Sequence, residues 1–563
     1  MTDARREWIK NLLNHLQSLH STAVDVVASQ CCSDGSFDSA RFDLHQPSSY
    51  ELAWASAELL AADSVLGVLD GQHTKLEERL ALLFAVEASV SVIARLESLF
   101  VGFPDTADHM GYLKTLHEIA ISENFVALRR ECCSEAALME TGLLFSGAQG
   151  EFSDCGLSDH VVMARDAFRS FARDVVAPLA EAIHRENKTV PEMLLEPLRE
   201  MGVFGLSIPE RYSGIAPDEH DDNLMMVVVT EALSEASLGA AGSLITRPEI
   251  LSRAILTGGT EQQKEQWLPK IAAGDPLCAV AFTEPDYGSD VAGLTLRATK
   301  CEGGWRLNGA KSWCTFAGKA GILLVLARTN PDRSLGHKGL SLFLVEKPSY
   351  EGVEFDYQPA DGGGRLLGSA IPTIGYRGMH SFELAFQDLF VPDDHVVGGD
   401  AGLGKGFYFT MAGMVGGRLQ TAGRALGIMR AALRASLVYA QERKIFGELL
   451  INFSLTRAKF SKLAARFFAC RQLSYSIAEA LNKGGGRVEA SLAKLYACRS
   501  AEIVTREALQ IQGGMGYSEE SSVSRYFLDA RVLSIFEGAE ETLALKVISR
   551  NLIEQSIAGA RKE

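Results

Sequence analysis

Apolar residues recur at helical spacing through the first 150 residues of the chain. The first apolar stripe consists of Trp8, Leu12, Leu16 and Leu19. The same spacing of three or four positions continues in the segments 50–69, 76–100 and 108–141. This pattern predicts amphipathic helices, with a single helix over 108–141, that pack as a small antiparallel bundle over residues 1–145. A polar stretch with several glycines at 145–159 predicts the linker that ends the bundle.

The pattern changes twice in the remaining chain, which predicts three further domains. Residues 158–276 keep the helical spacing, and it returns over 396–563, with long periodic runs at 424–443, 454–482 and 488–512. Residues 277–395 instead carry short apolar runs typical of strands, at 294–300, 305–307, 321–328 and 340–346. Gly303-Gly304 and Asn308-Gly309 separate such runs and predict hairpin turns. We therefore expect an α+β protein, mainly α, with a β domain between helical domains.

Composition limits the class of protein. A chain of 563 residues is too long for one ordinary domain, and 47% apolar with 22% charged residues is typical of a globular protein with large cores. The formal net charge of −16 disfavours a large basic surface for nucleic acid or for an anionic membrane. A local basic pocket for an anionic ligand is still compatible with this charge. We expect neither nucleic acid nor a membrane as a partner.

Cysteine usage and the N-terminal residues indicate a cytoplasmic protein. The ten cysteines show neither CxxC nor Cys/His metal-binding spacing, so reduced, packed thiols and no metal centre are expected. Residues 1–10 carry charges of both signs and no signal-peptide apolar core, and their acids argue against a mitochondrial presequence. The uninterrupted apolar stretches are too short to span a bilayer.

The first candidate site is a polar loop at residues 281–290, with the sequence AFTEPDYGSD. Pro285 keeps the preceding Glu284 out of the helical conformation, and Gly288 permits a tight turn with exposed amides. Such a loop can present hydroxyl and N–H groups to a planar or anionic ligand. Taken alone, the loop is equally well explained as a polar connection between strands.

Six motifs, in order, resemble signatures of the acyl-CoA dehydrogenase family. The loop at 281–290 resembles the family's TEPxxGSD signature. The other five are Lys311-Ser312-Trp313-Cys314-Thr315, Gly375-Tyr376-Arg377-Gly378-Met379 with Glu383-Leu384, Glu442-Arg443-Lys444-Ile445-Phe446-Gly447, Gln510-Ile511-Gln512-Gly513-Gly514-Met515-Gly516-Tyr517 and Ile535-Phe536-Glu537-Gly538. The resemblance covers residues 159–552. It implies the family's fold, which is a helical domain, a β-barrel-like middle domain and a C-terminal four-helix bundle, here preceded by the extra N-terminal bundle.

The resemblance implies FAD as the cofactor and a homo-oligomer as the active form. The implied FAD contacts within one subunit are Phe282, Thr283, Ser289, Trp313 and Thr315. Among them, Trp313 would lie against the flavin ring and Thr315 would bond to its N5 edge, while Ser289 would also contact the substrate. The implied contacts to the FAD of a neighbouring subunit are Arg443, Phe446, Gln510 and Gly514. Sharing FAD across an interface implies a homodimer or a homotetramer.

Glu537 is the candidate catalytic base. An isolated Phe-Glu-Gly segment would more often place its carboxylate at a helix start, facing the positive end of the macrodipole. In this motif, the resemblance implies that Glu537 removes the proton alpha to the carbonyl of an acyl-CoA thioester, and that hydride passes from the beta carbon to flavin N5. Charge on the thioester oxygen would be stabilised by the N–H of the base residue and a ribityl hydroxyl. Electron-transferring flavoprotein is the implied electron acceptor.

The surroundings of the candidate base differ from the family pattern in one place. Some family members carry the base at the position that corresponds to Gly417, where glycine cannot serve. Arg418 matches an arginine that lines the family's site, although a structural salt bridge explains it equally well. Phe536 and Gly538 are further expected substrate contacts. After Gly538 the family often has Thr-Ser-Gln, whereas this chain has Ala539-Glu540-Glu541, so a hydroxyl and an amide that commonly contact the flavin nucleotide are missing.

Arg247 is the candidate that bears on the acyl group. It falls in the helical region that lines the acyl pocket of the family, where a guanidinium suits a dicarboxylic acyl group better than an apolar chain. Pairing with Glu249 or with a surface acid is the competing structural explanation. Tyr376 and Arg377 are weaker candidates for the same pocket. The N-terminal domain and the Thr-Arg-Pro-Glu-Ile stretch are similar to those of family members that act on a branched C4 dicarboxylic thioester.

Other functions stay open at this point. An oxidase of the same fold would pass electrons to O2. A nitroalkane-oxidising relative is disfavoured because it resembles the family with aspartate where Glu537 stands. A DNA-binding relative would need a basic face, which the net charge of −16 disfavours. The N-terminal bundle could dock a partner or stabilise an oligomer, and nothing in its residues decides between these roles.

Overall fold

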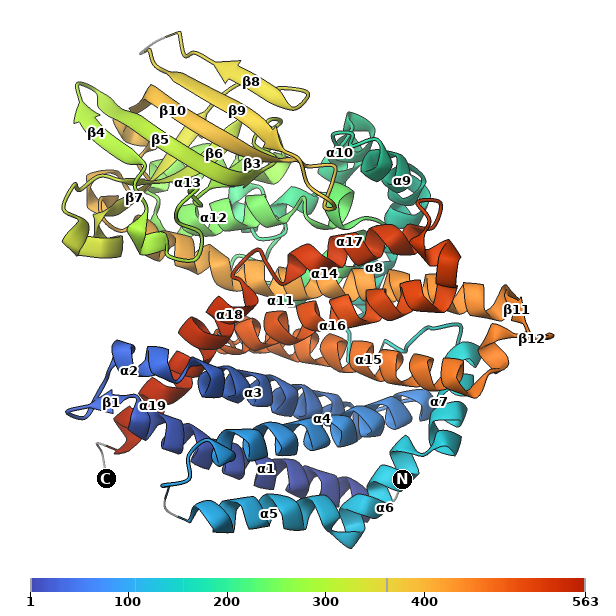
Figure 1. Cartoon of the computed structure of the whole chain (residues 1–563). Helices are drawn as coiled ribbons and strands as arrows, with labels where there is room; N and C mark the ends of the chain where they lie inside the picture. The colour runs from blue at the N-terminus through green and yellow to red at the C-terminus, as the bar shows by residue number, and fades with distance from the viewer. Residues whose placement is uncertain (1–2, 107, 155, 361–362, 561–563) are drawn as a thin grey trace. The chain divides into compact units, whose positions relative to one another are not determined.

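The computed structural model describes residues 3–106, 108–154, 156–360 and 363–560 (Figure 1). The chain divides into two compact units, each built from segments far apart in sequence. The bundle unit comprises Met1–Val162, Ile428–Ala480 and Gly486–Glu563. The sheet unit comprises Met163–Gly427 and Leu481–Gly485.

Long helices form the N-terminal part of the bundle unit. They are α1 at Asp3–Gln30, α3 at Gln46–Gly67 and α4 at Lys75–Val101, with the short α2 at Ser39–Leu44. A capping box starts α4, because the Thr74 hydroxyl accepts from the Glu77 N–H and the Glu77 carboxylate accepts from the Thr74 N–H. The helices predicted over 50–69 and 76–100 are confirmed.

The prediction of a single helix over 108–141 is wrong. Three helices occupy this stretch, α5 at His109–Ile121, α6 at Glu123–Cys133 and α7 at Glu135–Gly147. Ser122 and Ser134 each end one helix and cap the next, because their hydroxyls accept from the N–H groups of Phe125 and Ala137. Apolar spacing continues across both breaks, so periodicity alone does not reveal them, whereas serine before an acidic residue is the signal that does.

One helix of the described chain, Gln46–Asp70, is long and apolar enough to cross a membrane by length and composition. However, 67% of its most apolar window is buried inside the structure, with Leu52, Trp54 and Leu59 among the buried residues. The core helix of a helical bundle has the same properties, so this helix is weak evidence for a membrane span.

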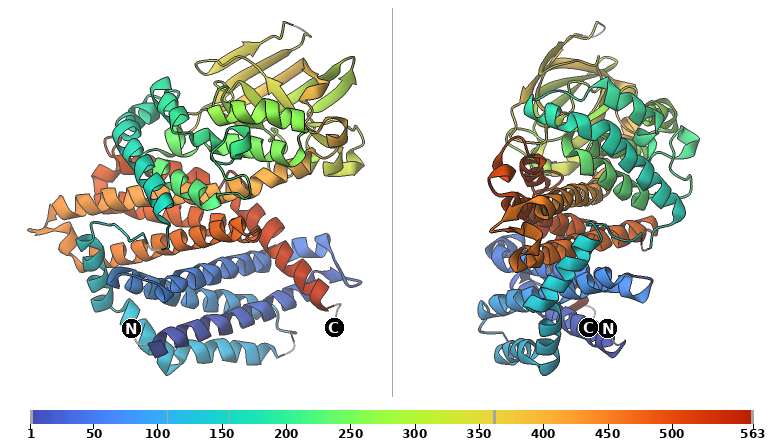
Figure 2. Two further views of the ribbon diagram at one scale, coloured as in Figure 1. Left: turned by 180° about the vertical axis from the view of Figure 1, so that it is seen from behind. Right: turned by 90° about the vertical axis from the view of Figure 1, so that its right-hand side faces the viewer.

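The C-terminal helices of the bundle unit pack against the N-terminal ones. They are the end of α14 (Gly406–Glu442), α15 at Ser454–Asn482, α16 at Glu489–Gln512, α17 at Ser522–Leu533, the short α18 at Glu540–Thr542 and α19 at Arg550–Ala560. Helix α3 lies beside α16, and α1 lies beside α19 (Figures 1 and 2). Tyr496 of α16 holds the two sets together, since its ring packs 6.3 Å from Trp54 and 5.8 Å from Phe84 between centroids.

The sheet unit combines helices with one curled eight-stranded sheet. Its helices are α8 at Asp159–Phe171, α9 at Ala177–Arg185, α10 at Glu192–Glu200, α11 at Asn223–Ala236, α12 at Thr246–Gly258, α13 at Glu261–Ala273 and the start of α14. The strands are β3 at Cys278–Ala281, β4 at Arg297–Cys301, β5 at Gly304–Thr315, β6 at Ile322–Arg328, β7 at Leu340–Glu346, β8 at Glu354–Tyr357, β9 at Arg365–Ile371 and β10 at Ser381–Pro392. They pair in the order β3-β6-β4-β5-β10-β9-β8, with β7 added on β6.

Strand β6 is buried on both faces, which explains its continuous apolar run. Ile322, Leu324 and Leu326 pack with residues of α12 and α13, which cover one face of the sheet (Figure 1). The alternate residues Leu323 and Val325 join the core enclosed by the curled sheet itself. The strands predicted at 321–328 and 340–346 are therefore confirmed, and the two-sided burial accounts for the missing polar alternation.

Only one of the two predicted hairpin turns exists. The turn before Gly304 joins β4 to β5, as expected. Asn308-Gly309 instead lies inside β5, so this prediction is wrong. The Asn308 side chain exchanges two hydrogen bonds with Asp388 of β10, at 2.7 and 3.0 Å, where the register between the strands shifts. The Asn-Gly pair thus serves a bulged strand pairing rather than a turn.

Candidate active site

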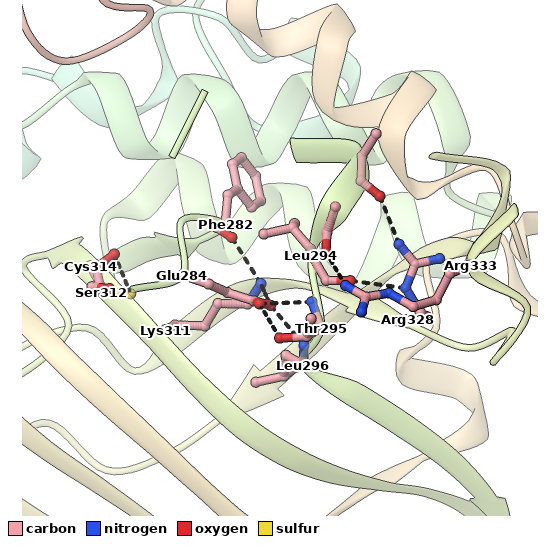
Figure 3. Close-up of polar contacts among 12 residues, drawn as sticks. Phe282, Glu284, Leu294, Thr295, Leu296, Lys311, Ser312, Cys314, Arg328 and Arg333 are labelled. Atoms are coloured by element: carbon pink, nitrogen blue, oxygen red, sulfur yellow. Dashed lines mark hydrogen bonds and ion pairs between the residues drawn. The ribbon is translucent and has the colours of Figure 1, made fainter. Parts of the chain in front are cut away.

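A buried ion pair anchors the loop at 281–290. Glu284, 4% exposed, lies 3.0 Å from the ammonium of Lys311 on β5, which is fully buried. The Glu284 carboxylate also accepts hydrogen bonds from the N–H groups of Thr295 and Leu296, at 2.7 and 2.8 Å (Figure 3). Lys311 donates a second bond to the Phe282 carbonyl, at 2.8 Å. Every buried charge in the loop therefore has partners, as such groups require.

Glu284 and Lys311 each affect the pKa of the other. Burial alone would raise the pKa of the Glu284 carboxyl, but Lys311 and the hydrogen bonds from Thr295 and Leu296 outweigh burial, so its pKa is lowered. Burial lowers the pKa of Lys311 to about 8, against the attraction of Glu284. Glu284 is therefore a structural carboxylate, ionised at neutral pH, and not a candidate acid or base.

The anchored loop lies beside an exposed indole. The Ser312 N–H donates to the Thr283 carbonyl at 2.9 Å, which brings the loop next to Trp313. Trp313 has a φ of +58° and is 57% exposed, while its neighbour Thr315 is buried and lies 3.0 Å from the Ser381 hydroxyl. The left-handed backbone turns the indole out of the sheet. An exposed aromatic face beside hydroxyl and amide groups fits the isoalloxazine of FAD.

The remaining predicted contact in this loop, Ser289, is exposed, and Phe282 and Thr283 are half-buried. Phe282, Thr283, Trp313 and Thr315 are thus brought together at the ends of β3 and β5. Their individual contacts with FAD stay predictions.

A second group of predicted residues meets where α12 and α14 pack in the sheet unit. Helix contact is so close that a β-carbon at Gly416 would lie 2.1 Å from the carboxylate of Glu249. Glu249 accepts a short hydrogen bond from Gln420 and lies 3.6 Å from the guanidinium of Arg253. Pairing of Arg247 with Glu249, the competing explanation from sequence, is therefore not what the structure has.

Arg247 is 4% exposed, and its Nη1 donates to the Ser243 carbonyl at 3.0 Å. Within the described residues, no carboxylate lies within 4.0 Å of its guanidinium. Three polar atoms here, Thr246 Oγ1, Arg247 Nε and Gln420 Oε1, are buried without a hydrogen-bond partner in the described chain. Buried polar atoms in native proteins are nearly always satisfied, and a water or a polar ligand at this place would satisfy these three.

The other predicted pocket residues are Arg418, Arg377 and Tyr376, and they differ in their surroundings. Arg418 is half-buried on α14, directly after Gly417, in the part of the helix that faces α12. Arg377 donates to the carbonyls of Thr373 and His184, at 3.1 and 2.9 Å, and so holds its own loop. Its role is structural, whereas Tyr376 beside it is buried with a φ of +58°.

Glu537 lies in a left-handed turn of the bundle unit, between α17 and α18. Its φ is +54° and that of Gly538 is +100°, and the Glu537 side chain is half-buried. The buried ammonium of Lys494 on α16 donates to the Gly538 carbonyl at 2.6 Å. The N–H of Glu540 closes the turn on the Ser534 carbonyl at 3.0 Å. Glu537 is therefore not in the first turn of a helix, where a carboxylate that only stabilises the helix macrodipole would lie.

The residues predicted to reach a neighbouring subunit's FAD lie on the surface of the bundle unit. Arg443 precedes a two-residue hairpin, and Phe446 at its tip has a φ of +49° and is 96% exposed. Gln510 and Gly514 are exposed at the end of α16. All four face solvent in a single chain, as residues that act in a neighbouring subunit would. Phe536, beside Glu537, is half-buried.

Three family descriptions match the chain along its length. Residues 158–275 match "Acyl-CoA dehydrogenase, N-terminal domain", residues 279–389 match the middle domain, and residues 404–553 match the C-terminal domain. The chain belongs to the acyl-CoA dehydrogenase family. Family membership confirms the predicted fold, the oxidoreductase activity and FAD as the cofactor.

Three proteins illustrate how close the relationship is. (2S)-Methylsuccinyl-CoA dehydrogenase of Cereibacter sphaeroides is 41% identical over 406 residues, which cover 72% of this chain and 71% of that protein. The mitochondrial short-chain specific acyl-CoA dehydrogenase of Bos taurus is 33% identical over 68% of this chain and 88% of its own length. The structure of butyryl-CoA dehydrogenase from Megasphaera elsdenii is 31% identical, covers 71% of this chain and all of its own (100%), and gives a TM-score of 0.64.

Sequence reasoning missed the groups that hold the site in place. The Glu284–Lys311 pair joins residues 27 positions apart, and Gln420 meets Glu249 across 171 positions. In both pairs the side chains are chemically complementary. Their separation in sequence matches neither the helical nor the strand period, so a sequence pattern does not reveal the contact. The available signal was that Glu284 and Lys311 are opposite charges that each stand inside a family-like motif.

Proposed function

We propose that the protein oxidises (2S)-methylsuccinyl-CoA to mesaconyl-CoA, a step of the ethylmalonyl-CoA pathway. The observation that carries this proposal is the buried guanidinium of Arg247, which has a backbone carbonyl as its hydrogen-bond acceptor and no carboxylate within 4.0 Å among the described residues. The 41% identity to an enzyme named for this substrate supports the same choice.

A buried arginine without a counter-ion is costly, because removing a charge from water costs several kcal/mol unless a partner compensates. A free carboxylate on the acyl chain would supply that partner, and a carboxylate can accept two parallel bonds from the guanidinium. The unsatisfied Thr246 hydroxyl would add a further donor to that carboxylate. A monocarboxylic acyl chain would leave both the Arg247 guanidinium and the Thr246 hydroxyl unpaired. The pocket chemistry therefore favours a dicarboxylic thioester.

Glu537 would remove the proton alpha to the thioester carbonyl. Its turn is held by Lys494 through the Gly538 carbonyl, and the Glu537 N–H would donate to the thioester oxygen. Such a donor stabilises the negative charge that develops when the proton leaves. Bound FAD would supply the hydride acceptor at its N5 atom. Trp313 and Thr315 would orient the flavin ring against the sheet unit.

The partners follow from the same assignment. We propose electron-transferring flavoprotein as the electron acceptor, and a homodimer or homotetramer as the active form, because Arg443, Phe446, Gln510 and Gly514 are exposed in one chain. A cytoplasmic location completes the proposal and is tested by fractionation.

Anaerobic mixing of the purified flavoprotein with a panel of acyl-CoA esters tests the substrate. We expect (2S)-methylsuccinyl-CoA to bleach the flavin absorbance, and butyryl-, isobutyryl- and glutaryl-CoA to leave it nearly unchanged. Faster bleaching by a monocarboxylic ester would overturn the substrate assignment. Repeating the reaction in air, with and without electron-transferring flavoprotein, identifies the acceptor, since stoichiometric hydrogen peroxide would mark an oxidase.

A further inference from the structure

A tyrosine from the N-terminal helices contacts the turn that carries Glu537. The Tyr50 hydroxyl on α3 donates to the Glu540 carboxylate at 2.5 Å. Arg499 on α16 donates to the same carboxylate, with its Nε at 3.0 Å from Glu540 Oε2. Glu540 is 5% exposed and lies three residues after Glu537. A carboxylate from the turn is thus held between the N-terminal helices and the C-terminal bundle.

The contact is part of a continuous interface within the bundle unit. The hydroxyl of Ser549, at the end of the helical segment Leu543–Ser549 that follows α18, makes a short hydrogen bond to the carbonyl of Ser49, which precedes Tyr50. The guanidinium of Arg499 lies 5.6 Å from the ring centroid of Trp54, one helical turn after Tyr50. Burial and then the bond to Glu540 raise the pKa of the Tyr50 hydroxyl, so it stays a donor at neutral pH.

The interface includes the residues at which the chain departs from the family pattern. The Ala539-Glu540-Glu541 stretch stands where the family pattern has a hydroxyl and an amide after the Glu-Gly pair. In this chain Glu540 turns to Tyr50 and Arg499. The same turn needs external support, because Glu537 has a φ of +54°, a conformation that is unfavourable for a residue with a side chain.

We propose that the N-terminal domain is a positioning element for catalysis, and that Tyr50, through Glu540, fixes the turn that presents Glu537. Tyr50 is a positioning residue rather than a catalytic one, because it touches neither substrate nor cofactor in this assignment. The proposal rests on the function proposed above, in which Glu537 is the base. In this role, the extra N-terminal helices support catalysis within their own chain and need no docked partner.

Tyr50→Phe tests the proposal, with Tyr112→Phe as the matched control. Both variants lose one tyrosine hydroxyl in the same unit, but Tyr112 donates to the Leu19 carbonyl at 2.8 Å and has no link to the turn. We expect Tyr50→Phe to slow flavin reduction at saturating substrate about tenfold, the loss expected when one bond to a charged group is removed. FAD content, melting temperature and the Kd for the acyl-CoA should change no more than in Tyr112→Phe.

The kinetic isotope effect separates positioning from general damage. If proton removal becomes slower, the effect of α-deuteration on flavin reduction should increase in Tyr50→Phe and stay unchanged in Tyr112→Phe. In a Glu540→Gln background, Tyr50→Phe should cost much less than tenfold, because both residues act through one contact. Equal reduction rates and isotope effects in Tyr50→Phe and Tyr112→Phe would overturn the proposal.

Glu537→Gln distinguishes failure of this proposal from failure of the proposed function. Loss of flavin reduction in Glu537→Gln with an unaffected Tyr50→Phe would leave the base in place and remove the positioning role. Normal flavin reduction in Glu537→Gln would instead remove the base assignment itself, whatever Tyr50→Phe does.

Discussion

Glu537 combines an unfavourable backbone conformation with the carboxylate that we propose as the catalytic base. Outside glycine, a φ of +54° costs on the order of 1–3 kcal/mol and persists where surrounding contacts impose it. Here those contacts are the Lys494 bond to Gly538 and the closure of Glu540 on Ser534. Glycine at this position would be free of that cost, so the presence of a glutamate supports the proposed role of its carboxylate.

Glu537→Gln should abolish flavin reduction without destabilising the fold. Glutamine has the same shape and the same backbone cost, but its amide cannot accept the proton, so the rate should fall by at least about 100-fold. Stopped-flow absorbance measures the rate, and differential scanning calorimetry measures the melting temperature. Glu97→Gln is the matched control, since Glu97 is exposed on α4 of the same unit, and it should reduce flavin at the normal rate. Comparable losses in both variants would contradict the base assignment.

Arg247 and Arg253 lie on the same helix and differ in their partners. Arg253 lies 3.6 Å from Glu249 and also pairs with Asp221, whereas Arg247 has no carboxylate within 4.0 Å in the described chain. Arg253 therefore stabilises the fold, whereas the buried charge of Arg247 destabilises it.

Arg247→Met should separate dicarboxylic from monocarboxylic substrates. Removing the guanidinium should weaken methylsuccinyl-CoA about 10- to 100-fold and leave butyryl-CoA unchanged, because only the dicarboxylic ester loses a charged hydrogen bond. The melting temperature should stay or rise. Titration of ligand binding and thermal unfolding measure the two quantities.

Arg253→Met is the control for this prediction, and it should lower the melting temperature because two carboxylates lose their partner. If Arg247→Met were to weaken both classes of ester equally and destabilise the protein, Arg247 would be a structural residue.

At the residue scale, the sequence could predict those groups whose roles depend on a short motif. Glu537, Trp313 and Thr315 stand in contiguous motifs, and the structure gives each a conformation compatible with the predicted role. Glu540 could be recognised as a departure from the family pattern, but not as the partner of Tyr50, 490 positions away. Contacts of that separation depend on how helices pack, which no local pattern encodes.

At the element scale, the Glu284–Lys311 pair makes the loop at 281–290 part of the sheet. Lys311 belongs to β5, and Glu284 also bonds to Thr295 and Leu296 just before β4. Thr283 sits between these anchors, so its position depends on them. Displacing the loop would leave a buried charge unpaired, so the pair holds the loop against the sheet.

Lys311→Met should destabilise the protein and weaken FAD retention together. The substitution leaves the Glu284 carboxylate buried without a cation, which costs about 3–5 kcal/mol. Lys300→Met is the matched control in the neighbouring strand, since Lys300 and its partner Asp393 are half exposed, and its effect should stay below about 1 kcal/mol.

Chemical denaturation with and without added FAD measures both effects of Lys311→Met. A variant with normal stability that still loses FAD would mean that Lys311 contacts the cofactor directly rather than anchoring the loop.

Periodicity predicted long uninterrupted helices better than the breaks and turns between shorter elements. Helix α15 has the predicted bounds, Ser454–Asn482, because a long apolar stripe must stay on one face. The stretch 108–141 failed because Ser122 and Ser134 offer caps that compete with a continuous helix. Asn308-Gly309 failed because Asp388, on another strand, satisfies the asparagine side chain. Both failures come from side chain to backbone or side chain to side chain bonds that an apolar pattern does not contain.

At the scale of the whole molecule, two large aromatic side chains of the bundle unit lie almost fully in solvent. Phe446 is 96% exposed at a hairpin tip, and Tyr517 is 85% exposed after α16. Phe446 has a φ of +49° and is followed by Gly447 at +86°, which fits the tight two-residue turn that holds it outward. A defined backbone that holds a large side chain in solvent supports the proposed contact of Phe446 with a neighbouring subunit.

Phe446→Glu should shift the protein toward the monomer and lower its FAD content in parallel. If Phe446 packs against a cofactor bound by a neighbouring subunit, a carboxylate there would place a negative charge beside the cofactor phosphates and remove the aromatic contact. Sedimentation velocity measures the oligomer, and the ratio of flavin to protein absorbance measures FAD. Added FAD should partly restore the oligomer, because a ligand bound at the interface stabilises the associated state by mass action.

Leu44→Glu is the control for Phe446→Glu, since Leu44 is 79% exposed on the N-terminal helices of the same unit. It introduces the same charge at an exposed apolar position and should change neither the sedimentation coefficient nor the FAD content. A monomer that keeps its FAD in Phe446→Glu would place the cofactor within a single chain, and the exposed hairpin would then serve association alone. Loss of FAD from an intact oligomer would instead locate Phe446 at the cofactor of its own subunit.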